Sequence, residues 1–119
     1  AMGLLRWFTK NWANTQEPTH PDLAPVVVPL DPVAAVELVK KAAANLPRWK
    51  VESEAVNELK LTRRTPTVGL VDDVTVTVKA AGPGAMLHAA SKSRVGLGDL
   101  GQNRRNILEL WAAVRAALD

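Results

Sequence analysis

The feature that most limits the fold of this chain is the stretch VDDVTVTVKA at residues 71–80. Its hydrophobic residues alternate with polar ones, so that Val74, Val76 and Val78 fall on one face and Lys79 on the other. A period of two is typical of a β-strand with one buried face and one solvated face. The chain is therefore expected to contain a half-solvated sheet that packs its apolar face against another layer.

Three further segments predict strands of the same sheet. Alternation starts at Trp49, after a break in the helical pattern, and returns at residues 58–65 and 85–95. The last two strands are separated by the turn AAGPGA at residues 80–85, where glycine and proline favour a chain reversal. Four successive strands joined by short connections predict an antiparallel sheet.

A helix is expected immediately before the strands. Asp31 precedes Pro32, and aspartate caps the first amides of a helix while proline suits its first position. An apolar stripe that begins at Val33 extends this helix over residues 32–46.

A second helix is expected at the end of the chain. It is predicted to start near Asp99, because Gln102 three residues later fits a capping box, and to run to Leu118 with one apolar face. The predicted fold class is α+β: a helix, a four-stranded antiparallel sheet and a C-terminal helix, in a domain over residues 32–119.

The first thirty-one residues divide into two parts. Residues 1–14 form an amphipathic segment that predicts a short helix, and residues 15–31 are proline-rich and extended, with Val26–Val28 as a candidate edge strand. The apolar residues that recur at helical spacing are Leu4, Leu5, Phe8 and Trp12. Trp7 and the cations Arg6 and Lys10 complete the set that would dock the segment. Such a segment docks on its own domain or a partner, and the alternative is a membrane surface.

Composition restricts the chemistry. The chain has no cysteine and only two histidines, His20 and His88, so thiol catalysis is excluded and no catalytic residue, metal site or cofactor is predicted. Lysine and arginine exceed the acidic residues by 15 to 12, which is too small an excess to indicate nucleic-acid binding. A non-enzymatic protein is the favoured prediction.

The stretch SKSRVGLGDLGQNRR at residues 91–105 concentrates basic residues where the last strand enters the last helix. The free amides at a helix start attract anions and disfavour cations, so a compensating negative group is expected there. The candidate residues for binding a small anion or an acidic partner surface are Lys92, Arg94, Gly101, Asn103, Arg104 and Arg105.

Two interpretations of this junction remain open. In the first, favoured one, the compensating charge is internal, and a structural polar network is expected from Asp72, Asp73, Ser91, Ser93 and Asp99. In the second, Arg94 and Arg104 hold an anionic ligand together with backbone amides. Asp72 and Asp73 are adjacent on a strand and point to opposite faces, so a shared acid–base site is not expected.

Four sequence motifs, in order, resemble a bacterial and plastid family known as domain of unknown function 1499. They are HPDLAP (20–25), LPRWKV (46–51), VDDVTVTV (71–78) and SKSRVGLGDLGQNRRNI (91–107), and the similarity runs from about Asn11 to the end of the final helix. The matching positions are Asp72, Asp73, Ser91, Ser93, Arg94, Gly96, Asp99, Gly101 and Asn103. This chain departs from the family at Ala90, where an arginine is usual.

The resemblance implies no activity, because the family has no established mechanism. Some relatives carry hydrophobic N-terminal extensions and are tied to membranes or the cell envelope. The expected location of this chain is cytoplasmic, because no apolar run approaches the length of a membrane span. The alternative is peripheral attachment to a membrane through residues 4–12. The four tryptophans are also compatible with self-association into a homo-oligomer.

Overall fold

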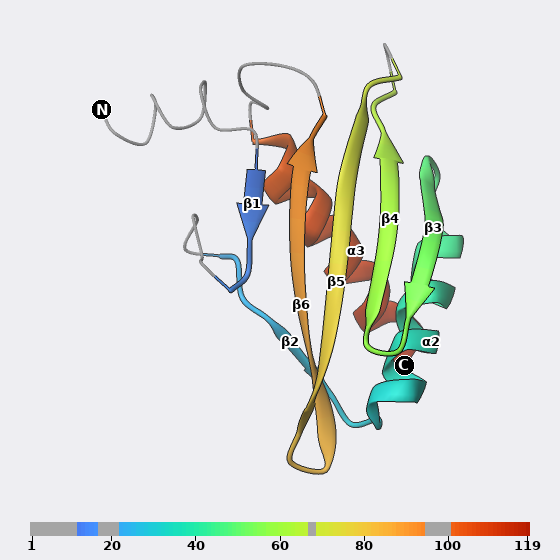
Figure 1. Cartoon of the computed structure of the whole chain (residues 1–119), viewed down its shortest axis with the longest axis vertical. Coiled ribbons are helices and arrows are strands. Elements are labelled where there is room, and N and C mark those ends of the chain that lie inside the picture. The colour runs from blue at the N-terminus through green and yellow to red at the C-terminus, as the bar shows by residue number, and fades with distance from the viewer. Residues whose placement is uncertain (1–11, 17–21, 67–68, 95–100) are drawn as a thin grey trace.

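The computed structural model describes residues 12–16, 22–66, 69–94 and 101–119. It contains an antiparallel sheet with two helices behind it, which leave the front face of the sheet open (Figure 1). The α+β class, the antiparallel sheet and the C-terminal helix are as predicted from the sequence. The elements are β1 (Trp12–Asn14), β2 (Val26–Val28), α2 (Pro32–Ala44), β3 (Trp49–Ala55), β4 (Glu58–Arg64), β5 (Val71–Ala81), β6 (Gly84–Ser93) and α3 (Gln102–Leu118).

The sheet has six strands instead of the predicted four. Its order is β1-β6-β5-β4-β3, and β2 also pairs with β6. The two additional strands come from the N-terminal segments: Trp12–Asn14 lies beside residues 90–92, and Val26–Val28 lies beside residues 85–87. Because β6 would otherwise be an edge strand, these two short segments satisfy its free backbone groups.

The prediction of a short helix within residues 1–14 is therefore wrong at its C-terminal end, since Trp12–Asn14 is a strand. The apolar spacing that suggested a helix extends over residues 4–12, but edge pairing with β6 determines the structure of its last residue. Residues 4–11, which carry the rest of the amphipathic pattern, lie outside the described part of the chain.

Both helices pack on the same face of the sheet. Asp31 caps α2 as predicted, since its Oδ1 accepts a hydrogen bond from the amide of Ala34 at 2.9 Å. The valines of β5 that alternate in the sequence are buried beneath the helices. The largest fully buried side chains are Trp111, Leu59, Leu61, Leu87, Ile107 and Leu110. Burial of this apolar layer is the main stabilising contribution to the fold.

The start of α3 differs from the prediction. The helix begins at Gln102, and its N-cap is Gly101 in a left-handed conformation with φ 81°. The expected cap, Asp99, lies outside the described residues. A glycine at this position adopts positive φ without the strain that a Cβ would bring, but it supplies no side chain to cap the first amides.

Candidate functional site

A largely buried polar row crosses the sheet near the start of α3, where β3 and β5 begin and β4 and β6 end. Figure 1 shows these strand ends at the top of the view. Strand register places Trp49 opposite Arg63, Arg63 opposite Asp72, and Asp72 opposite Ser93. These residues share the face that the helices cover. Polar side chains at such positions require hydrogen-bond partners, because an unsatisfied buried group costs about 1–3 kcal/mol.

The partners come from one side of α3. Asn103, Asn106 and Glu109 follow one another at intervals of three residues and so lie along one side of the helix. Asn103 and Asn106 are fully buried, whereas Glu109 is about one-third exposed. The helix therefore lays a line of polar groups over the polar row of the sheet.

Asn106 joins two strands to α3. Its Nδ2 donates to Asp72 Oδ2 at 2.7 Å and to Ser91 Oγ at 3.2 Å. Its Oδ1 accepts a hydrogen bond from Gln102 Nε2 at 2.7 Å. Asp72 is only 3% exposed, so this amide is the principal compensation for a carboxylate removed from water.

Asn103 completes the network. Its Oδ1 accepts from Ser91 Oγ at 2.6 Å, and its Nδ2 donates to Ser93 Oγ at 2.9 Å. Of the predicted structural network, Asp72, Ser91 and Ser93 thus lie together beneath α3. Asn103, which the sequence suggested as an anion ligand, is buried among them instead of facing solvent.

Arg63 forms the other half of the buried row. Its Nε donates to Glu109 Oε1 at 3.3 Å, and the indole nitrogen of Trp49 donates to the same oxygen. Arg63 is 6% exposed, and its Nη1 has no hydrogen-bond partner among the described residues. A buried guanidinium with one carboxylate partner depends strongly on that carboxylate.

The surface arginines of the junction have internal carboxylate partners. Arg94 binds Asp73 through two hydrogen bonds of 2.8 Å, from Nε and from Nη2. The bonds from Arg94 lower the pKa of Asp73, and those to Asp73 raise the pKa of Arg94. Arg104 forms a similar two-point contact with Asp22 through Nε and Nη2, and the hydrogen bonds to Asp22 raise the pKa of Arg104.

The remaining predicted residues are not gathered at one place. Lys92 is exposed on the open face of the sheet, directly opposite Asp73 across β5 and β6. Arg105 lies on α3, where its Nη2 donates to Gln102 Oε1 at 3.2 Å. Gly101 is the N-cap of α3. The structure thus brings Lys92 and Arg94 together, and separates them from buried Asn103.

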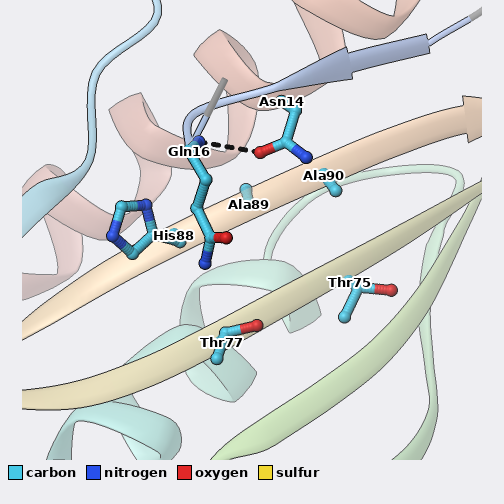
Figure 2. Close-up of a pocket in the computed structure, with 7 residues that line it drawn as sticks. All are labelled: Asn14, Gln16, Thr75, Thr77, His88, Ala89 and Ala90. Carbon is cyan, nitrogen blue, oxygen red and sulfur yellow. Dashed lines mark hydrogen bonds between the residues drawn. The ribbon is translucent and has the colours of Figure 1, made fainter. Parts of the chain in front are cut away.

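A shallow pocket of about 100 Å³ lies on the open face, between β6, β5 and the residues that follow β1 (Figure 2). Its polar lining carries no ionised side chain: Asn14, Gln16, Thr75, Thr77 and His88, with Ala89 and Ala90 completing it. Ala90, where an arginine was expected from the resemblance, belongs to this pocket. The site is too small for a ligand much larger than a few atoms.

His88 is held at the edge of that pocket. Its Nδ1 lies 3.1 Å from Thr15 Oγ1, which also accepts a hydrogen bond from the amide of Ala89 at 2.9 Å. Partial burial lowers the pKa of His88, and the charge of Lys79 lowers it further. Both effects favour the neutral form of the His88 imidazole.

Several important residues were missed in the sequence analysis. Asn106, Arg63, Glu109 and Asp22 were not singled out, although each forms a polar contact that joins separate elements. For Asn106 a signal was present, because it adjoins Ile107 on the apolar side of a predicted helix and a buried amide there needs a partner. For Asp22 no local pattern points to Arg104.

The described residues hold no group of three or more histidine, cysteine, aspartate or glutamate side chains that could bind a metal ion. Within the same part of the chain, no helix combines the length and apolarity needed to cross a membrane.

Known structures resemble this fold at low sequence identity. DynU16, described as a putative protein in the dynemicin biosynthetic locus, matches with a TM-score of 0.59 and 14% identity over 92% of this chain and 47% of DynU16. Protein CV1439 from Chromobacterium violaceum matches with a TM-score of 0.52 and 11% identity, over 91% of this chain and 97% of that protein. The present chain spans about half the length of DynU16. At these identities the likeness shows the fold alone.

Comparison with curated protein sequences finds no match. A family profile does match residues 7–114. This range contains the strand-to-helix junction and the buried asparagines Asn103 and Asn106. Because the match covers most of the sequence, the chain belongs to the family described as Protein of unknown function (DUF1499).

Proposed function

We propose that this protein is a non-enzymatic binding domain that takes a small anion or an acidic partner surface at the junction of β6 and α3, residues 91–105. The observation that carries the proposal is the position of Lys92. This lysine is exposed on the open face and has no ion pair within the described residues. The carboxylate opposite it, Asp73, already accepts two hydrogen bonds from Arg94, from Nε and from Nη2.

The internal pairs reduce the part that the arginines play in binding. Arg94 and Arg104 each meet an aspartate, as the favoured interpretation of the sequence expected. Because each arginine is paired with a carboxylate, the two pairs add little net charge and few free donors to a ligand site. Lys92 is the direct contact in this proposal, and the partner is an acidic group that approaches the open face beside Arg94.

The test is thermal unfolding of the wild type and of Lys92→Ala in sodium phosphate and in sodium chloride at equal ionic strength. Phosphate that binds only the folded state raises the melting temperature. The proposal expects a larger rise in phosphate than in chloride, and a smaller difference in Lys92→Ala. Lys41→Ala, which removes an exposed lysine from α2, is the matched control. An equal rise in the two salts for the wild type contradicts the proposal.

A second candidate is peripheral attachment to a membrane through residues 4–12. It is supported by Trp12, which is 37% exposed on β1 and lies directly opposite Lys92. An exposed indole beside a lysine suits the interface of an anionic bilayer. The measurement is cosedimentation with vesicles that contain an anionic lipid. The triple variant Leu4→Ser, Leu5→Ser, Phe8→Ser is expected to lose binding, and unchanged binding argues against this candidate.

Fewer tryptophans are available for self-association than the count of four suggested. Trp49 and Trp111 belong to the core, so a homo-oligomer that associates through tryptophan would use Trp12 or the segment before it. We expect any such assembly to be abolished by the same triple variant, which sedimentation velocity would show.

A further inference from the structure

A second concentration of positive charge lies on the open face where β3 begins and β4 ends, one strand away from Lys92. Here the open face is hollowed by a pocket of about 310 Å³. The side chains of Lys50, Glu52, Thr62 and Arg64 line it, together with Arg48 and Trp49. Lys50 and Thr62 lie directly opposite each other in neighbouring strands, so the pocket spans both.

The charges around this pocket are unbalanced. Arg48, Lys50 and Arg64 face one carboxylate, that of Glu52. That carboxylate already accepts a hydrogen bond of 2.9 Å from Thr62 Oγ1, and Lys50 Nζ lies 3.9 Å from it. Two formal positive charges therefore remain without a counterion in the lining.

The guanidinium groups retain most of their donors. Arg64 makes one side-chain hydrogen bond in the described part of the chain, from Nη1 to the carbonyl of Gly69 at 3.4 Å. Arg48 makes none within the same residues. Each guanidinium carries five N–H donors, so both can bind the oxygens of an anion.

The backbone of Arg48 is held in an uncommon conformation. Its φ is 69°, and it is the one non-glycine residue with positive φ among those described. This left-handed conformation costs about 1–2 kcal/mol for a residue with a Cβ. Its carbonyl accepts a hydrogen bond from the amide of Arg64 at 3.0 Å, which fixes the chain at the mouth of the pocket. Glycine would fit this backbone better, so an arginine at this position lowers the stability of the fold.

We propose that this pocket is an anion site for a phosphate group, bound by Arg48 and Arg64 with Lys50 at its side. The planar guanidinium fork matches the oxygens of phosphate, and the ammonium of Lys50 adds a point charge. The volume of about 310 Å³ exceeds that of phosphate itself, so the pocket also has room for the group that carries it. Lys92 is not part of this lining: it lies on β6, and β5 separates β6 from β4, the nearer of the two strands that line the pocket.

The test is a titration of the full chain with inorganic phosphate, followed by the amide signals in two-dimensional NMR, against sodium chloride at equal ionic strength. Saturable shifts are expected at residues 48–52 and 62–64 in phosphate alone. Arg48→Gly is the informative variant, because it removes the charge and the backbone strain together. It is expected to weaken phosphate binding at least fivefold and to raise the melting temperature. A variant that fails to fold cannot give this pair of results.

Arg64→Ala provides a second variant, and Lys79→Ala, which removes an exposed lysine elsewhere on the open face, is the control. Lys92→Ala separates this site from the proposed junction site. Lys92→Ala is expected to leave the phosphate-induced shifts at residues 48–52 unchanged. This result is expected whether or not the junction site itself binds phosphate. Equal shifts in chloride, or unchanged phosphate affinity in Arg48→Gly, would overturn the proposal.

A final arm identifies the carrier of the phosphate. Glycerol 3-phosphate in solution is compared with vesicles that contain phosphatidic acid. Displacement of inorganic phosphate by the soluble ester assigns a soluble ligand, and displacement by vesicles alone assigns a lipid headgroup. Displacement by neither contradicts the assignment to a phosphate ester.

Discussion

Two adjacent aspartates illustrate how differently the two faces of this sheet use polar residues. Asp72 faces α3, is 3% exposed and accepts a hydrogen bond from Asn106. Asp73 faces the open side, has a half-exposed side chain and pairs with Arg94. Of these two consecutive residues, Asp72 must find its hydrogen-bond donors within the protein, whereas Asp73 can also accept hydrogen bonds from water.

The difference extends along both faces. On the covered face, Ser91, Ser93 and Asp72 each have a partner in α3. Ser91 and Asp72 are buried, so removal of their partners leaves polar groups that water does not reach. On the open face, Lys92 and Arg48 lack a carboxylate partner within the described residues. Matched polar groups hold an element in place, and unmatched charges are available to a ligand. The covered row therefore belongs to the fold, and the open face is where binding is proposed.

The largest expected effect comes from Asn106→Ala. It leaves the buried carboxylate of Asp72 without its amide donor and creates a cavity, so the free energy of unfolding should fall by about 3 kcal/mol. Urea unfolding measures the change. Arg115→Ala, an exposed substitution on the same helix, is the control and should stay within about 0.5 kcal/mol of wild type. Similar losses in both variants would remove the distinction between the faces.

Glu109 and Arg63 should respond unequally, although they are partners. Glu109→Ala leaves the buried guanidinium of Arg63 without its carboxylate partner. The free energy of unfolding should fall by about 2–3 kcal/mol, less than for a fully buried pair, because Glu109 is about one-third exposed. Arg63→Met removes the buried charge together with its unsatisfied Nη1, and should cost less than half as much. Urea unfolding of both variants checks the order. A larger loss in Arg63→Met would mean that the arginine itself is the stabilising partner.

A smaller, pH-dependent effect is expected at His88. Burial lowers its pKa in the folded state, so the unfolded chain binds a proton first as pH falls. The stability that depends on the neutral imidazole is complete above about pH 6.5, the unfolded value, and is lost as pH falls through the folded pKa. An NMR titration should give His88 a pKa below about 6.5, and His88→Gln should lack this part of the pH dependence. A midpoint at or above the unfolded value contradicts the assignment.

Much of the architecture follows from local pattern. The valine alternation of β5 predicts which face is buried, and Asp31 before Pro32 predicts the start of α2, because both signals act over a few residues. The same alternation separates Asp72 from Asp73. The candidate edge strand Val26–Val28 is indeed a strand, although it was not counted in the four-stranded sheet. Trp12–Asn14 was missed because three residues are too short for a periodic signal, and its structure depends on the edge that β6 presents.

The polar contacts across elements were harder to predict. The sequence motif contains Ser91, Ser93 and Asn103, but their partnership depends on how α3 crosses the sheet. Arg104 and Asp22 are separated by most of the chain, and no spacing rule connects them. Arg48 is similar, since its left-handed backbone arises from the path between α2 and β3 and not from its residue type.

The measurement that tests this account most directly is the unfolding of Asp72→Ala and Asp73→Ala side by side. The substitutions are chemically identical and one residue apart. Asp72→Ala should lower the free energy of unfolding by about 3 kcal/mol, because Asn106 loses a buried acceptor and a cavity remains. Asp73→Ala should cost less than about 1 kcal/mol, since its ion pair is screened by solvent. Equal losses, or a larger loss in Asp73→Ala, would contradict the separation of a structural face from a binding face.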